Sequence, residues 1–149
     1  MVKVLFICHG NICRSTMAQS VMAYLVKEAG LERDFEIDSA GTSREEIGNP
    51  VHHGTRRKLQ QESIPLIPHR ARQMTKEDCR YFDLLIGMDQ WNIHNMERIA
   101  GKEYGNKIRL LLSYAGRQED IADPWYTGNF DKTFSDVMEG CTALLNTLK

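Results

Sequence analysis

One short loop restricts what this chain can fold into, the octet Cys8-His9-Gly10-Asn11-Ile12-Cys13-Arg14-Ser15. The residues before it, Val2 to Ile7, are nearly all apolar and typical of a strand buried on both faces. After it, apolar residues recur at helical spacing until Gly30, which predicts a helix that ends there. Backbone N–H groups at a helix start are unpaired and carry partial positive charge, so we expect an anion site, for phosphate above all.

The residue types in the octet equip this anion site for a reaction. Cys8 and Arg14 flank five residues, which predicts a closed cradle with a thiol at its floor and a guanidinium at its rim. The dipoles that bind phosphate also favour the thiolate form of Cys8. The planar fork of Arg14 suits two oxygens of a phosphoryl group. Gly10 and Asn11 tolerate left-handed backbone, which lets several N–H groups converge. The alternative to a reactive loop is a buried structural cysteine beside a surface arginine.

The octet and a downstream segment, Asp123-Pro124-Trp125-Tyr126, together resemble the low-molecular-weight protein tyrosine phosphatases. The similarity includes four further stretches and so covers essentially the whole chain: Asp38 to Thr42, Ile47 to Pro50, Ala71 to Gln73 and Met88-Asp89. The resemblance implies one low-molecular-weight phosphotyrosine protein phosphatase domain over residues 1–149. It also implies hydrolysis of phosphotyrosine in proteins, or of small aryl phosphates, through a phosphocysteine intermediate, with inorganic phosphate as product.

Composition limits the partners and the compartment. The 149 residues suit one domain, and the formal net charge of −1 gives no general attraction to nucleic acid or to an anionic membrane. No stretch has the length of a membrane span or the features of a signal peptide. Four cysteines without a secretion signal indicate a reducing cytoplasm, and no Cys/His cluster has zinc spacing. We therefore expect a cytoplasmic monomer that uses no metal ion and no cofactor.

Strand and helix patterns alternate along the chain, which predicts an α/β fold of three layers, α/β/α. The sheet should hold four parallel strands in the flavodoxin-like order 2-1-3-4, with ligands at the strands' carboxyl ends. The expected strands are residues 2–7, 35–39, 83–88 and 108–112. One expected helix directly follows the octet. The others cover about 51–61, a short piece after Thr75, about 90–99 and a closing stretch from 131. Residues 115–129 are expected to form a loop, and the histidines at 52 and 53 to be solvated.

Two further residues have chemistry that suits the predicted reaction. A carboxyl group can protonate a leaving oxygen and later accept a proton from water, and the resemblance assigns this role to Asp123. An ordinary Asp-Pro turn is the alternative for Asp123 and Pro124 taken alone. The hydroxyl of Ser15 can donate to the sulfur of Cys8, and the same residue can cap the following helix.

The resemblance assigns loop support to several other residues. Asn11, Ser39 and His69 match family residues whose hydrogen bonds hold the loop in a strained shape. We expect His9 at the rim, pointing outward, and Gly10 and Ile12 in the phosphate-binding backbone. Cys13 lies five residues from Cys8, and a protective disulfide between the two is a hypothesis from this spacing and from the resemblance.

The predicted substrate cleft departs from the family pattern. Glu45 stands where many family members place an aromatic residue that stacks on the substrate ring, and Thr16 stands where proline is common. Trp125 and Tyr126 can still wall the cleft and stack on a phenyl ring, although core positions are the alternative for both.

Three other functions are alternatives to hydrolysis. An arsenate reductase needs a further cysteine pair, whereas Cys79 and Cys141 each stand alone. A module that only binds phosphate would leave Cys8 and Asp123 unexplained. A P-loop nucleotide hydrolase fails because no Gly-Lys-Ser/Thr follows the loop.

Overall fold

The computed structural model describes residues 1–149, and its four strands form one parallel sheet. The order β2-β1-β3-β4 confirms the predicted fold class and strand order. Strand β1 is central, and its last residue, Cys8, pairs with Gly41 at the end of β2. The strands are β1 (Val2–Cys8), β2 (Phe35–Gly41), β3 (Leu84–Gly87) and β4 (Ile108–Leu110).

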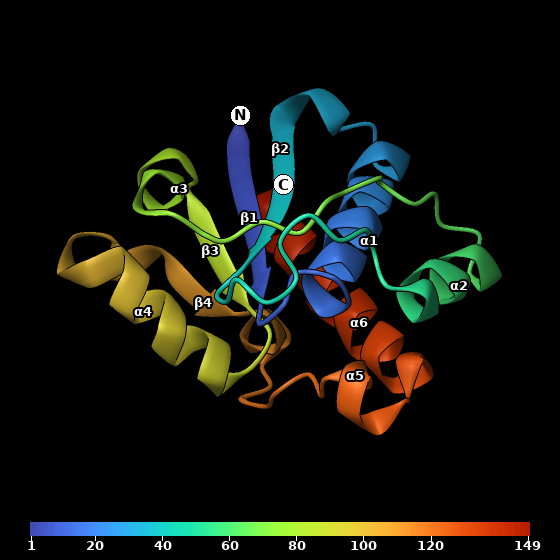
Figure 1. Cartoon of the computed structure of the whole chain (residues 1–149). Helices are drawn as coiled ribbons and strands as arrows, with labels where there is room; N and C mark the ends of the chain where they lie inside the picture. The colour runs from blue at the N-terminus through green and yellow to red at the C-terminus, as the bar shows by residue number, and fades with distance from the viewer.

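Helices cover both faces of the sheet (Figure 1). One face carries α1 (Arg14–Glu28), α2 (His53–Gln61) and α6 (Phe130–Leu148), which contact one another. The other carries α3 (Lys76–Tyr81) and α4 (Gln90–Tyr104). The chain also contains three short 3₁₀ helices, η1 (Glu32–Asp34), η2 (Gly105–Lys107) and η3 (Leu111–Ala115). None of the helices combines the length and the apolar character needed to span a membrane.

Strand β1 is buried on both faces because its side chains alternate between two hydrophobic cores. Val4, Phe6 and Cys8 pack in the larger core with α1 and α6. Leu5 and Ile7 pack in the smaller core with α3 and α4. This double burial explains the nearly continuous apolar run before the octet. Cys8, the last residue of β1, lies at the carboxyl ends of the strands, on the face covered by α1.

The fourth predicted strand is too long at its carboxyl end. Only Ile108–Leu110 is a strand, and Leu111 begins the 3₁₀ helix η3. The side chains of Leu111 and Leu112 are fully buried, and η3 packs against α6. A short apolar run does not distinguish a strand from a buried helical turn, so periodicity alone could not find this boundary.

The predicted loop 115–129 contains a helical turn, α5 (Pro124–Thr127). Asp123 caps α5 by accepting a hydrogen bond from the N–H of Trp125 at 3.0 Å, and Pro124 occupies the first helical position. An aspartate followed by proline is a recognised helix start, so the sequence did contain this signal.

Two other helix boundaries agree with the sequence. Thr75 and Asp78 form a capping box at the start of α3, as predicted. Gly101 interrupts the helical geometry of α4 with φ 71° and ψ −176°, at the predicted break, and the helix then resumes to Tyr104. Asp89 caps the start of α4, a position that proves important for the site.

Candidate active site

The octet joins β1 to α1 at the carboxyl edge of the sheet, where parallel sheets bind their ligands (Figure 1). Asn11 has the left-handed φ of 61° that the sequence led us to expect. The end of β2 supports the loop, because Thr42 and Ser43 donate backbone hydrogen bonds to the carbonyls of Cys8 and His9. A side chain at Gly41 would lie 2.8 Å from the carbonyl oxygen of His9, so this close approach requires glycine.

The sulfur of Cys8 is almost buried and has two polar neighbours. The N–H of Asn11 donates to it at 3.3 Å, and the Oγ of Ser15 lies 3.0 Å away. Ser15 Oγ already accepts a hydrogen bond from Asn11 Nδ2 at 2.8 Å, so its own hydrogen is free to point to the sulfur. Both neighbours can therefore act as donors to Cys8.

A buried hydrogen-bond network lies beneath the loop. Asn11 Nδ2 donates to Ser15 Oγ and also to Ser39 Oγ, the latter at 3.0 Å. Ser39 Oγ in turn donates to Gln19 Oε1 at 2.6 Å. The structure thus brings Asn11 and Ser39 together as predicted, and it adds Gln19, which sequence reasoning missed. Gln19 lies four residues after Ser15 on the same face of α1, a spacing that could have pointed to it.

His69 completes the contacts of Asn11 from the other side. Asn11 Oδ1 lies 2.8 Å from His69 Nε2 and accepts from the N–H of Arg72 at 3.1 Å. Since the amide oxygen of Asn11 is only an acceptor, His69 Nε2 carries the proton. Burial lowers the pKa of His69; the charge of Asp38 raises it by less than this, and the charge of Arg72 lowers it further. The histidine is therefore neutral in the folded protein near pH 7.

Arg14 is almost fully buried and is held by two carboxylates and a carbonyl. Its NH1 donates to Asp89 Oδ2 at 2.7 Å and to the carbonyl of Ile121 at 2.8 Å. Its NH2 lies 3.5 Å from Asp123 Oδ2. Burial alone would lower the pKa of Arg14, but the charges of Cys8 and Asp89 outweigh it and raise the pKa. The guanidinium of Arg14 therefore supplies a fixed positive charge next to Asp123.

Met88-Asp89 is part of the family resemblance, but sequence reasoning gave Asp89 no role in the site. It follows β3, which pairs with β1, so its carboxylate lies at the same sheet edge as Cys8. Its Oδ1 accepts from the N–H of Asn92 at 2.7 Å, while Oδ2 accepts from Arg14. A polar residue at the end of a neighbouring parallel strand was the available signal.

A pocket of about 60 Å³ joins Cys8 to Asp123. At roughly 10–15 Å³ for each water-sized atom, this volume suits the four oxygens of a phosphate group. Its lining includes most predicted site residues on the octet and in the cleft: Cys8, His9, Gly10, Ile12, Cys13, Glu45, Asp123, Trp125 and Tyr126, with Glu46 in addition.

The mouth of this pocket is polar on one side and aromatic on the other. His9 Nε2 lies 3.2 Å from Glu45 Oε2, and both side chains reach solvent. Trp125 and Tyr126 are 57% and 82% exposed, so neither belongs to the core. The ring of His52 contacts Trp125 edge-on and caps α2 through Nδ1, so His52 is half-buried rather than solvated.

The structure shows the surroundings of Thr16, which stands where proline is common, and of Cys13, which lies five residues from Cys8. Thr16 Oγ1 lies within hydrogen-bond distance of the carbonyls of Ile12 and Cys13, so it supports the first turn of α1 without proline. Burial, followed by the charge of Cys8, raises the pKa of Cys13 to about 12, which keeps this thiol protonated. The proposed pairing of Cys8 and Cys13 remains a prediction.

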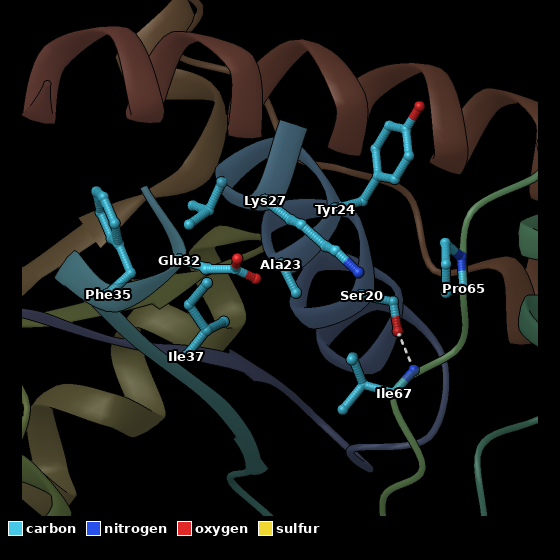
Figure 2. Close-up of a pocket in the computed structure, with 10 residues that line it drawn as sticks. Ser20, Ala23, Tyr24, Lys27, Glu32, Phe35, Ile37, Pro65 and Ile67 are labelled. Atoms are coloured by element: carbon cyan, nitrogen blue, oxygen red, sulfur yellow. Dashed lines mark hydrogen bonds between the residues drawn. The ribbon is translucent and has the colours of Figure 1, made fainter. Parts of the chain in front are cut away.

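Other features of the molecule lie away from this site. Cys79 packs in the smaller core and Cys141 in the larger one, on opposite faces of the sheet, so they form no relay toward Cys8. A larger pocket of about 340 Å³ lies between α1, β2 and Pro65 to Ile67, where Ile67 donates to Ser20 Oγ (Figure 2). It contains none of the predicted site residues. No three His, Cys, Asp or Glu side chains are grouped to hold a metal ion.

Comparison with known proteins agrees with this geometry. The family model described as low molecular weight phosphotyrosine protein phosphatase matches residues 3–149. The low molecular weight protein-tyrosine-phosphatase YfkJ of Bacillus subtilis is 40% identical, over 100% of this chain and 97% of its own length. The human low molecular weight phosphotyrosine protein phosphatase is 39% identical, over 93% of this chain and 88% of its own. The crystal structure of YfkJ superposes with a TM-score of 0.95 over 99% of this chain and 94% of that one.

Proposed function

The chain belongs to the low-molecular-weight phosphotyrosine protein phosphatases, and from this premise we propose how its own residues carry out the hydrolysis of phosphotyrosine. As a member of this family it is an enzyme, a protein-tyrosine phosphatase. The proposed domain comprises residues 1–149. The observation that carries the mechanism is the small pocket that both Cys8 and Asp123 line, with the carboxyl of Asp123 3.5 Å from NH2 of Arg14.

In the first proposed step, the thiolate of Cys8 attacks phosphorus. A sulfur–phosphorus bond forms while the bond from phosphorus to the phenolic oxygen breaks. Asp123 gives its proton to that oxygen, so the leaving group departs as a neutral phenol. Arg14 and the N–H groups of the octet hold the oxygens of the transferring phosphoryl group. Asp89 and the carbonyl of Ile121 keep the guanidinium of Arg14 in place.

In the second proposed step, water attacks the phosphocysteine. Asp123, now a carboxylate, accepts a proton from the water, inorganic phosphate forms, and the thiolate of Cys8 is released. The hydroxyl of Ser15 lies 3.0 Å from the sulfur and eases this release by donating to it. Asn11, Ser39 and His69 act as positioning residues, because their hydrogen bonds hold the octet open toward the phosphate.

The same proposal needs no metal ion and no cofactor, because Arg14 and backbone N–H groups supply the positive charge and Asp123 moves the protons. The site takes all of its residues from one chain, which supports action as a monomer. The four cysteines are free thiols, and unpaired thiols are typical of a reducing compartment, which supports the cytoplasm.

Hydrolysis of an aryl phosphate with excess chelator tests the proposal. We expect turnover in the wild type and a loss on the order of 10⁴-fold or more in Cys8→Ser, because the nucleophile is removed. Cys79→Ser, a buried cysteine in the other core, is the matched control and should keep the activity. Rapid quenching should trap phosphate on Cys8 of the wild type.

Three outcomes contradict the proposal in different ways. Activity that survives in Cys8→Ser excludes the covalent cysteine step. Activity that the chelator removes excludes the metal-free mechanism. Phosphate binding without any turnover in the wild type identifies a binding module instead of an enzyme.

A further inference from the structure

A second pocket, of about 260 Å³, opens directly beside the catalytic one. The two pockets share His9, Asp123 and Tyr126, so a substrate held by Cys8 lies next to both. The second pocket continues past Arg14 and Asp89 to the first turn of α4, where Trp91 and Asn92 line it. Arg14 and Asp123 take part in the proposed chemistry from the wall of this pocket, but no proposed step uses Trp91.

Two exposed aromatic side chains line this second pocket. Trp91 is 63% exposed at the start of α4, and Tyr126 is 82% exposed on α5. The ring of His94 stacks on Trp91 with centroids 5.5 Å apart, which restricts the orientation of the indole. An indole face near a reaction pocket is a favourable surface for a planar or cationic group, with tryptophan the strongest of the aromatic residues.

The charges around the pocket favour a cation over an anion. Asp89 and Asp123 line it, and Asp120 accepts a hydrogen bond from the N–H of Gln90, the residue before Trp91, at 3.0 Å. Arg14 is the buried positive charge, and a bound phosphoryl group would neutralise it. Asp123 carries a proton when the substrate binds, so the negative charge facing a group in this pocket comes from Asp89, Asp120 and the phosphoryl group itself.

We propose that the pocket between Trp91 and Tyr126 is a substrate subsite that receives an arginine or lysine side chain next to the phosphotyrosine of a polypeptide. Adjacent Cα atoms are about 3.8 Å apart, so a residue beside the phosphotyrosine begins at the mouth that the two pockets share. The cation stacks on Trp91 and faces the carboxylates of Asp89 and Asp120. This inference rests on the proposed function, and it specifies which polypeptide substrates the subsite selects.

Two phosphotyrosyl peptides of equal length, one with arginine and one with glutamine beside the phosphotyrosine, test the subsite. The measured quantity is kcat/KM for each peptide relative to that for a small aryl phosphate, which has no neighbouring residue. We expect the wild type to prefer the arginine peptide, and Trp91→Ala to lower that preference by about 3- to 30-fold, the range of a cation–π contact. Trp91→Phe should retain part of the preference.

Two further variants separate charge from packing. Asp120→Asn keeps an acceptor for Gln90 but removes the charge, so it should lower the arginine preference and its dependence on salt. Tyr81→Ala removes an exposed aromatic residue on α3, outside the pocket, and should leave the preference unchanged.

The two proposals fail in different ways. If the wild type does not hydrolyse the aryl phosphate, the proposed function is wrong. If it does, but both peptides react equally well or Trp91→Ala keeps the full preference, only the subsite is wrong. A normal rate with the aryl phosphate in Trp91→Ala shows that the variant is folded.

Discussion

Asn11 illustrates how one residue can determine the shape of the whole loop. Its backbone adopts the left-handed conformation, which an asparagine adopts more readily than most residues. Its amide donates to Ser15 and Ser39 and accepts from His69, while its N–H faces the sulfur of Cys8. The conformation and the contacts require each other, because only this backbone orientation lets one side chain reach both sides of the loop.

At the same scale, Asp123→Asn tests the role of the acid. Asparagine keeps an oxygen that can accept from the N–H of Trp125, so the cap of α5 should survive. It cannot donate a proton to a leaving phenolate as a carboxylic acid does. We expect kcat for an aryl phosphate with a poor leaving group to fall by about 10²–10⁴-fold. A nitrophenyl ester, whose leaving group needs little protonation, should lose much less.

The comparison between leaving groups is the decisive part of that measurement. A fall of the same size for both esters would show that Asp123 shapes the pocket and does not transfer a proton. Competitive inhibition by inorganic phosphate is the control, and it should be nearly unchanged, since Arg14 contacts Asp123 only at 3.5 Å.

Residue types in a local motif were predictable from the sequence, and partners distant in the chain were not. Cys8, Arg14 and Ser15 lie in one octet, and Asp123 precedes a proline at a recognised helix start. Asp89 lies 75 residues from Arg14 and is an ordinary helix cap when considered alone. Its second contact depends on which strands are neighbours, and that is a property of the assembled sheet.

At the scale of the element, η3 shows tertiary packing deciding between a strand and a helical turn. The run from Ile108 to Leu112 is apolar enough for a longer strand. The chain turns at Leu111 because this side chain fits against α6 at Gly140, where a helix without a side chain leaves room. The information that ends β4 is therefore located in α6, about thirty residues later.

Gly140→Ala tests this dependence. Alanine has the higher helix propensity, which alone would stabilise α6 by about 1 kcal/mol. The added Cβ would lie 2.5 Å from Leu111 Cγ, and overpacking of a core costs about 1–3 kcal/mol. We expect the collision to dominate, so urea denaturation should show a lower free energy of unfolding.

Gly105→Ala is the matched control for this substitution. Gly105 has φ −60° and no atom within 4 Å of the added Cβ. Alanine there should be neutral or stabilising by up to about 1 kcal/mol, through the unfolded chain. Equal effects of the two substitutions would show that Leu111 has space to move and that η3 does not depend on Gly140.

At the scale of the whole molecule, the alternation of strands and helices made the fold predictable. Each helix returns the chain to the same edge of a parallel sheet, so the carboxyl ends of β1, β2 and β3 meet. Cys8, the Gly41 turn and Asp89 are consequently neighbours, although they come from three separate segments. The short turn α5 was not predicted, since four residues are too few for a periodic signal.

The final prediction concerns stability and pH, and it depends on two histidines that join segments of the fold. Burial lowers the pKa of His69, which contacts Asn11, and that of His52, which caps α2 and touches Trp125. Each pKa is lower in the folded chain than in the unfolded chain, where it is about 6.5. The unfolded chain therefore binds more protons below about pH 6.5, and the free energy of unfolding should decrease as the pH falls through the folded pKa values.

Variants can assign this slope to the histidines. Gln at position 69 can donate from Nε2 to Asn11, and Asn at position 52 can accept from the N–H of Gly54, but neither side chain titrates. We expect His69→Gln and His52→Asn each to reduce the loss of stability between about pH 7.5 and pH 5.5 in urea denaturation. Carboxylates such as Glu119, whose pKa is lowered by Arg117, lose their contribution only at more acidic pH. An unchanged slope in the double variant would show that the two histidines do not couple the stability of this fold to pH.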